Sequence, residues 1–281
     1  EMMVGKKISL NINRTQPQNV TARLVVKNID CVNREGVKML DNVTFTARSG
    51  EILGIAGIAG SGQRELLEAI AGLQQLNCGE IFYHNPKTGD IDDLRNKTPI
   101  QIRELGVRLS FVPEDRLGMG LVGNMDIVDN MMLRSYSKGK SFFLERMKPR
   151  TLAEEIIEQL EVVTPNANTP VRMLSGGNVQ KILVGREIAA APTVLMVAYP
   201  VRGLDINSSY TIFNLLNEQK KKGAAVILVG EDLDVLIELC DRIMVIGNGK
   251  ISGIVDGRTT TKEEIGLLMT RTDGGENNGK N

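Results

Sequence analysis

Two short runs of uninterrupted apolar residues constrain the fold of this chain more than any other feature. Residues 194–198 read Val-Leu-Met-Val-Ala, and residues 226–229 read Val-Ile-Leu-Val. Strands that are apolar on both faces are typical of a parallel sheet covered by helices on both sides. Each run is followed by a predicted helix, near residues 208–222 and 233–239. We therefore expect an α/β fold with a mixed or parallel core sheet.

Other segments predict the rest of this architecture. Residues 24–26 and 43–46 are expected to be strands of a small antiparallel sheet. Residues 51–55 and 107–112 predict two more core strands, and Gly247-Asn248-Gly249 predicts a hairpin between strands at 242–246 and 250–255. After the strand at 51–55 a helix is expected to bury one face, which carries Leu66, Leu67, Ile70 and Leu73.

Two local patterns concern single helices. Thr151 followed by Glu154 resembles a capping box, which predicts a helix from that point to about residue 161. Lys220, Lys221 and Lys222 end another predicted helix, where positive charge complements the helix dipole. We interpret these lysines as a helix end and not as a binding patch.

The composition excludes several classes of protein. The chain has 281 residues, with 34 Lys and Arg against 34 Asp and Glu, and this balance argues against a protein that binds nucleic acid. Aromatic residues are 4% of the chain and Trp is absent, so base-stacking surfaces are not expected. Cys31, Cys78 and Cys240 lack the spacing of a zinc site, which favours a reduced, intracellular protein. Because no apolar stretch approaches about 20 residues, any membrane role is expected to need a partner.

The chain divides by composition into three parts. Residues 1–20 have no sustained periodicity and are expected to be a linker, and residues 271–281 are expected to be a disordered tail. Residues 21–270 between them are expected to form one folded domain. His84, the single histidine, is expected to be a surface or turn residue.

The first candidate site is a glycine-rich loop between the strand at 51–55 and the following helix. Its candidate binding residues are Gly57, Gly60, Ser61, Gly62, Gln63 and Arg64. Such a loop aims backbone N–H groups at phosphate oxygens, although a tight strand–helix turn has the same composition. A phosphate loop has Lys and then Ser or Thr where this chain has Gln63 and Arg64. We therefore expect this loop to hold a triphosphate less well.

The second candidate site opens a helix downstream, at Leu174, Ser175, Gly176, Gly177 and Asn178. A helix cap with a glycine turn would explain these residues alone. Taken with the glycine loop and the order of the strands, however, the segment resembles the signature motif of ATP-binding-cassette (ABC) ATPases. The resemblance implies the ABC-type fold: a core sheet, an antiparallel β subdomain and an α-helical signature subdomain at about residues 115–185.

Further positions of the family are placed by the same resemblance. Ala198 and Tyr199 stand where the family has the Walker B Asp and the catalytic Glu, and Glu231 stands where it has the switch His. Asp205 lies in an intact D-loop, and Glu114 takes the place of the Q-loop Gln. The resemblance implies no catalytic residue and no metal site in this domain, and a coupling role for Glu114 and Asp205.

The degenerate positions together resemble the second cassette of tandem ATPases that serve simple-sugar and nucleoside importers. Further likeness to that group lies in Thr164-Pro165 and in residues 113–116, 169–172 and 263–269. The resemblance implies ATP with Mg²⁺ at a composite site shared with a first cassette. It also implies membrane permease subunits, indirectly a solute-binding lipoprotein, no nucleic acid, and a peripheral place on the cytoplasmic side of the membrane.

Two other hypotheses remain open at this point. One is a self-sufficient hydrolase that uses Arg64 with carboxylates such as Glu65, Asp205 or Glu231. The other is a non-transport ABC ATPase that acts in translation or DNA repair. The zero net charge and the absence of long basic or coiled-coil segments speak against the second of these.

Overall fold

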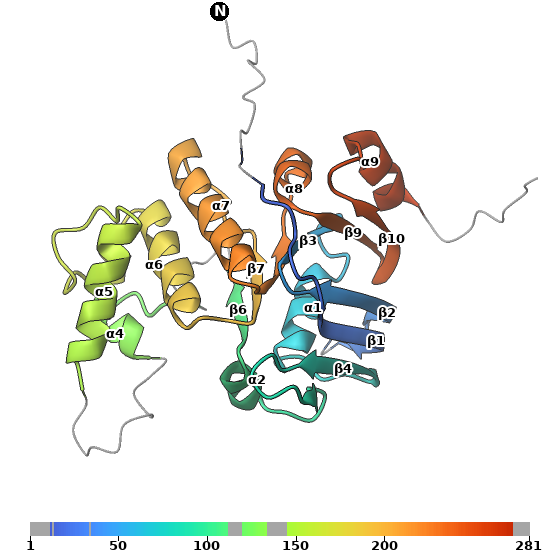
Figure 1. The fold of residues 1–281 in the computed structure, drawn as a ribbon, viewed down its shortest axis with the longest axis horizontal. Helices are drawn as coiled ribbons and strands as arrows, with labels where there is room; N and C mark the ends of the chain where they lie inside the picture. Colours follow the sequence, from blue (N-terminus) through green and yellow to red (C-terminus); the bar gives the residue numbers. More distant parts are fainter. Residues whose placement is uncertain (1–11, 13, 34, 112–119, 134–144, 272–281) are drawn as a thin grey trace, which may run out of the picture.

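The fold is built on two β-sheets that face each other across one helix (Figure 1). The computed structural model describes residues 12, 14–33, 35–111, 120–133 and 145–271. The first sheet is antiparallel, with the order β2-β1-β4-β5. Its strands are β1 (Ala22–Val32), β2 (Lys38–Arg48), β4 (Cys78–His84) and β5 (Ile91–Asp93). The expected antiparallel strands lie within β1 and β2 and are confirmed.

The second sheet has the order β10-β9-β3-β8-β7-β6 and is parallel apart from the β9–β10 hairpin. Its strands are β3 (Glu51–Ala56), β6 (Val107–Phe111), β7 (Val194–Ala198), β8 (Ala225–Val229), β9 (Arg242–Gly247) and β10 (Lys250–Asp256). Every residue of β3, β7 and β8 is buried, as the apolar runs predict. Asn248 and Gly249 have positive φ angles of 49° and 78°, which a tight hairpin turn requires.

Helices cover both faces of the mixed sheet. Between the two sheets lies α1 (Gln63–Ile70), and α2 (Pro99–Leu105) leads into β6. The opposite face is covered by α7 (Ile206–Lys221), α8 (Leu233–Leu239) and α9 (Lys262–Thr270). Side chains of β7 alternate between the two cores, so that Ala198 faces the α1 side and Val197 faces the α7 side.

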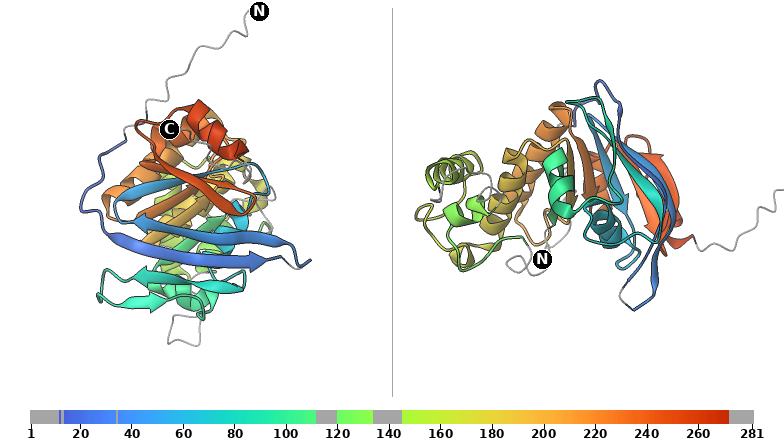
Figure 2. Two further views of the ribbon diagram at one scale, coloured as in Figure 1. Left: turned by 90° about the vertical axis from the view of Figure 1, so that its right-hand side faces the viewer. Right: turned by 90° about the horizontal axis from the view of Figure 1, so that it is seen from below.

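A helical group lies at one end of the molecule, at the opposite end from the antiparallel sheet (Figure 2). Its elements are α4 (Ile127–Met132), α5 (Met147–Gln159), the 3₁₀ turn η1 (Val171–Met173) and α6 (Gly176–Ala189). Residues such as Val128, Ile156 and Leu183 give it a buried core of its own. This group is the α-helical subdomain that the fold class implies.

Two local expectations are wrong. Leu73 is exposed and lies beyond the end of α1, because Gly72 turns the chain there with φ 73°. Thr151 does not open a helix: α5 begins at Met147, and the Thr151 hydroxyl donates to the Met147 carbonyl within it (3.2 Å). The lysines do lie at the end of α7, as predicted, but Lys220 is only 2% exposed.

Buried Lys220 belongs to a polar cluster that holds the N-terminal segment against the domain. Its ammonium lies 2.8 Å from an Asp241 carboxylate oxygen and donates to the Thr15 carbonyl (2.5 Å). Arg258 donates to the same two groups, at 3.1 and 3.0 Å. Arg14 donates to carbonyl oxygens beyond this cluster, those of Ile237, Cys240 and Gly257. Residues 14 and 15, which composition assigns to a linker, are therefore bound to the domain.

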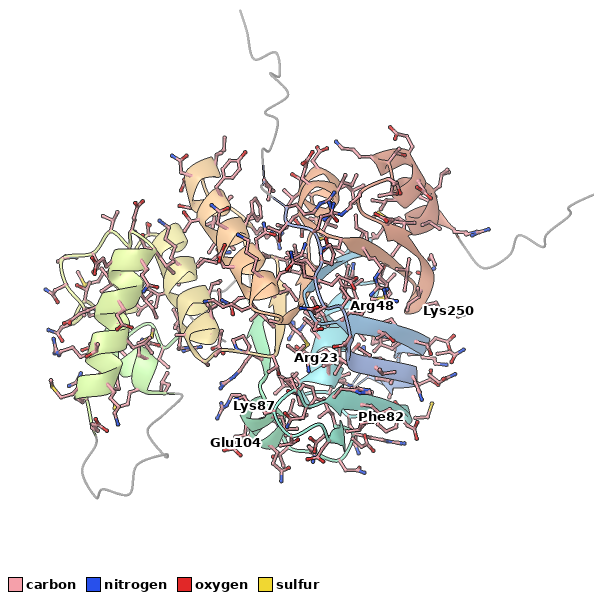
Figure 3. The ribbon with its side chains drawn as sticks, viewed as in Figure 1. Arg23, Arg48, Phe82, Lys87, Glu104 and Lys250 are labelled. Carbon is pink, nitrogen blue, oxygen red and sulfur yellow. The ribbon has the colours of Figure 1, made fainter. Side chains whose placement is uncertain are left out.

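The antiparallel sheet separates a buried inner face from a half-exposed outer face (Figure 3). Tyr83 points inward and donates to the Leu105 carbonyl (3.0 Å). Neighbouring Phe82 is half-buried, and the Lys27 ammonium lies 5.2 Å from its ring centroid. His84 ends β4 and is half-buried. Within the described residues, no helix is both long enough and apolar enough to cross a bilayer.

Candidate functional site

The glycine loop joins the carboxyl end of β3 to the start of α1, at the edge of the sheet where phosphate loops lie in α/β folds. Gly62 is the residue before α1 and has φ 102°, and no side chain caps the helix there. A Cβ on Gly62 would lie 2.5 Å from the Met39 carbonyl oxygen, so this close approach needs glycine. Free backbone N–H groups at a helix start are a general anion-binding feature.

The Gln63 side chain lies inside this loop and is bonded to its backbone. Its side chain is 3% exposed, and its Nε2 donates to the Ile58 carbonyl oxygen of the same loop (3.1 Å). A Cβ on Gly57 would lie only 2.6 Å from this Nε2. The amide thus fills the interior of the loop and brings no charge to it.

Arg64 points away from the loop along α1. Its exposed guanidinium forms an ion pair with Glu68, one helical turn later (2.7 Å). Ser61 is buried, and its carbonyl accepts from the Gly249 N–H (3.0 Å), which ties the loop to the β9–β10 turn.

Ala198 and Tyr199, which the sequence resemblance sets at the Asp and Glu positions, lie at the end of β7. Ala198 is 1% exposed and presents only a methyl group to the core beside α1. Tyr199 is half-buried with φ 50°, and burial, followed by the nearby Glu231 carboxylate, raises the pKa of its phenol. A methyl group and a neutral phenol are not ligands for Mg²⁺, which prefers carboxylate oxygens. The residues present at the end of β7 therefore do not fit a metal ion.

Tyr199 and Glu231 come together in a pocket of about 390 Å³ between the ends of β7 and β8. Phe213 and Leu228 also line it. Glu231 is paired with Arg202, with 3.7 Å between the charged groups. Sequence reasoning did not identify Arg202, and no pattern around it signals this pairing. Across the described parts of the chain, no group of three or more His, Cys, Asp or Glu side chains is arranged to hold a metal.

The signature segment forms a second pocket of about 390 Å³, which we call the signature pocket. Ser175 is the N-cap of α6, Leu174 precedes it and packs on the helical core, and the glycines begin the helix. The D-loop and the start of α7 form the other wall, and Gly177 lies there beside Leu204 and Ser208. The lining is Val163, Ser175, Gly176, Gly177, Asn178, Lys181, Gly203, Leu204, Asp205 and Ser208.

Asp205 contributes structure to this pocket as the N-cap of α7. Its carboxylate accepts from the Ser208 backbone N–H (2.9 Å) and from the Ser208 hydroxyl (2.7 Å). These hydrogen bonds lower the pKa of Asp205. The signature and the D-loop, which lie 25 residues or more apart in the sequence, are thus brought together.

The structure does not bring the signature together with the glycine loop. The signature pocket has no lining residue from 57–64. Figure 1 shows α6 with the helical group at one side of the molecule and α1 between the two sheets. Glu114 lies outside the described residues.

A family model described as ABC transporter matches residues 40–200. The nucleoside import ATP-binding protein NupA of Lactococcus lactis subsp. cremoris is 37% identical over 272 residues, which cover 96% of this chain and 52% of that protein. The galactose/methyl galactoside import ATP-binding protein MglA 2 of Photobacterium profundum is 32% identical with the same coverage of each. The chain spans about half the length of these curated relatives.

Solved structures match the fold. A nucleotide-free ATP-binding cassette from an ABC transporter has a TM-score of 0.71 at 24% identity, covering 89% of this chain and 96% of that one. A dimeric cassette bound to ADP and phosphate has a TM-score of 0.70 at 22% identity, covering 84% and 100%. The α/β fold class with its helical subdomain is confirmed.

Proposed function

This chain belongs to the ABC transporter family, and from that membership we propose that it is the nucleotide-binding domain of an importer for nucleosides or simple sugars. Relatives named for nucleoside and galactoside import support this substrate class. In this proposal residues 21–270 are the cassette, residues 1–20 join it to a first cassette, and residues 271–281 are a tail. Helical residues at about 115–185 carry the signature.

The cassette's own nucleotide site is degenerate, and one observation carries this proposal. At the end of β7, in the core that α1 shares, the chain has the Ala198 methyl and the Tyr199 phenol. Neither group accepts a proton from water at neutral pH or ligates Mg²⁺. General-base catalysis alone contributes a factor of about 10² to 10⁴. The site therefore hydrolyses ATP negligibly, and the Gln63 amide weakens its hold on phosphate.

The chain's contribution lies at the signature pocket. Ser175, Gly176 and Gly177 close on ATP that a first cassette holds with Mg²⁺, so that hydrolysis takes place at that composite site. Exposure of Ser175 at the start of α6 supports this role, because the helix N-terminus favours an anion there. Asp205 fixes the D-loop beside it, and Glu114 lies where permease subunits dock.

The remaining partners follow from the importer assignment. Permease subunits hold the cassette at the cytoplasmic side of the membrane, and a solute-binding lipoprotein delivers the solute to them. Nucleic acid has no part in this function. A role in translation or DNA repair is not favoured, because the named relatives are import proteins.

The contacts of the candidate residues also disfavour a self-sufficient hydrolase. Arg64 pairs with Glu68, Glu231 pairs with Arg202, and Asp205 caps a helix. Each of these three charged groups thus has a structural partner. The remaining acid in that hypothesis, Glu65, lies in the first turn of α1.

The test is calorimetric titration of the chain with Mg·ATP, together with phosphate release at saturating ATP. We expect weak binding and no turnover above the buffer blank. Nanomolar binding or steady phosphate release that Arg64→Ala abolishes would contradict the degenerate site. Loss of phosphate release in Arg64→Ala would specifically indicate a self-sufficient hydrolase.

A further inference from the structure

Asn178 is the fifth residue of the signature segment, and its side chain is bonded to the backbone of Val163. It is 8% exposed. Its Oδ1 accepts from the Val163 N–H (3.1 Å), and its Nδ2 donates to the Val163 carbonyl (3.1 Å). This two-point pairing with a backbone fixes the amide orientation, because the N–H must face the amide oxygen and the carbonyl must face the amide nitrogen.

The fixed orientation determines the third contact of Asn178. Nδ2 lies 3.0 Å from Ser175 Oγ, and an amide nitrogen can only donate. The Asn178 backbone N–H lies 3.5 Å from the same Oγ, which is the capping interaction of α6. Ser175 Oγ is therefore an acceptor for two donors from Asn178. A hydroxyl that accepts twice has its proton left for a third partner.

That third partner lies on the pocket side. Ser175 is exposed and lines the signature pocket, so its remaining O–H proton is available to an acceptor such as a phosphate oxygen. Val163 lines the same pocket with its side chain 78% exposed. The buried Asn178 amide thus determines the direction in which the Ser175 hydroxyl donates. It also fixes the position of Val163 in the pocket wall.

We propose that Asn178 is a positioning residue that acts through Ser175: it makes the serine hydroxyl a pure donor aimed into the signature pocket. This inference rests on the proposed function, in which the pocket closes on the terminal phosphate of ATP. A donor fixed before the ligand arrives needs no reorientation when it binds, which strengthens the contact with an anion.

Asn178→Asp reverses the donor pattern. A carboxylate only accepts, so the Ser175 hydroxyl turns toward it and away from the pocket. In the assembled transporter, this variant should lower ATP turnover by about tenfold or more, the range for a lost hydrogen bond to a charged group. Asn168→Asp is the matched control: it adds the same charge at an exposed position outside the pocket lining, where the side chain accepts from Arg150, and should leave turnover unchanged.

A double-mutant cycle with Ser175→Ala separates positioning from general support of the fold. If Asn178 acts through the serine hydroxyl, Asn178→Asp has no further effect once that hydroxyl is removed. Additive losses in the double variant would overturn the proposal. Thermal unfolding of each variant identifies any variant that fails to fold. If Asn178→Asp does not fold, Asn178→Ser replaces it in the same cycle. If Ser175→Ala itself leaves turnover unchanged, the proposed function fails instead.

Discussion

The Gln63 amide lies inside the glycine loop, where its Nε2 donates to the loop's own Ile58 carbonyl. The backbone around it retains the features of an anion-binding turn, with positive φ at Gly60 and Gly62. A neutral amide contributes less to phosphate binding than a cation, because hydrogen bonds that involve a charged group are stronger by roughly a factor of two. We therefore assign the weak nucleotide binding that we propose for this site to the Gln63 side chain and not to the backbone of the loop.

Gln63→Lys should restore part of the phosphate affinity without restoring hydrolysis. One charge-assisted hydrogen bond contributes about 1.5–3 kcal/mol, so the Kd for ATP should fall by about tenfold or more. Turnover should stay at background, since Ala198 and Tyr199 supply no base. Calorimetry and phosphate release on the same sample measure both quantities. Unchanged affinity would mean that the backbone of the loop, and not residue 63, prevents binding.

Single residues also mark the limit of sequence-based reasoning. The positions of Gln63, Ala198 and Tyr199 relative to the strands were predictable, because Gln63 follows a glycine loop, Ala198 ends an apolar run and Tyr199 comes directly after it. The amide contact of Gln63 with Ile58 was not, since it depends on a side-chain rotamer inside a folded loop. The pairing of Asn178 with Val163 joins residues 15 apart in sequence through one side chain, and no periodicity signals it.

At the scale of elements, the loop before α1 approaches the antiparallel sheet closely. Gly60 and Gly62 both have positive φ, but a Cβ on Gly60 meets nothing within 4 Å, whereas a Cβ on Gly62 lies 2.5 Å from the Met39 carbonyl. Alanine substitutions at these two glycines therefore distinguish the cost of a left-handed backbone from the cost of a steric clash.

Gly60→Ala should reduce the free energy of unfolding by about 1–2 kcal/mol, the cost of a left-handed conformation for alanine. Gly62→Ala should cost about 1–3 kcal/mol more, because the strand must also move. Urea unfolding of both variants measures the difference. An equal loss of unfolding free energy in the two variants would show that the loop shifts at Gly62 without cost and is not held against β2.

The N-cap of α7 gives a pH-dependent prediction. Hydrogen bonds from Ser208 lower the pKa of Asp205 from its ordinary value of 3.8. A folded pKa below the unfolded pKa stabilises the fold above pH 3.8, and this contribution is lost as the pH falls through the folded pKa. The stability difference between the parent chain and Asp205→Asn should therefore shrink below pH 3.8, because Asn still caps the helix but does not titrate. Urea midpoints at pH 6 and about pH 3 measure it, and a constant difference would contradict the assignment.

At the scale of the whole molecule, the core sheet was predictable from sequence, because buried parallel strands leave uninterrupted apolar runs. The antiparallel sheet was expected from its own strand patterns, and the helical group only from the resemblance to ABC ATPases. The start of α5 was mispredicted because Thr151 satisfies the capping pattern yet bonds back to Met147 inside the helix. The cluster of Lys220, Asp241 and Thr15 was missed because it joins three distant segments, and a Lys-rich helix end predicts solvent exposure.

Asp241→Ala should both destabilise the molecule and release its N-terminal segment. Removing one partner of a buried ion pair costs about 3–5 kcal/mol, because Lys220 is left buried and unpaired. Trypsin should then cleave after Arg14 faster than in the parent chain, as followed by mass spectrometry. Glu218→Ala removes an exposed pair with Lys221 and serves as the control. Unchanged protection of Arg14 in Asp241→Ala would show that the cluster does not hold the segment.

The most direct test of an asymmetric cassette compares two variants of the assembled transporter. Ser175→Arg places a large cation in the signature pocket, where it blocks closure on the partner's ATP, and should remove most ATPase activity. Arg64→Ala alters only the degenerate loop and should leave most activity in place. Steady-state ATP hydrolysis measures both. The opposite ranking, with Arg64→Ala inactive and Ser175→Arg active, would contradict the account.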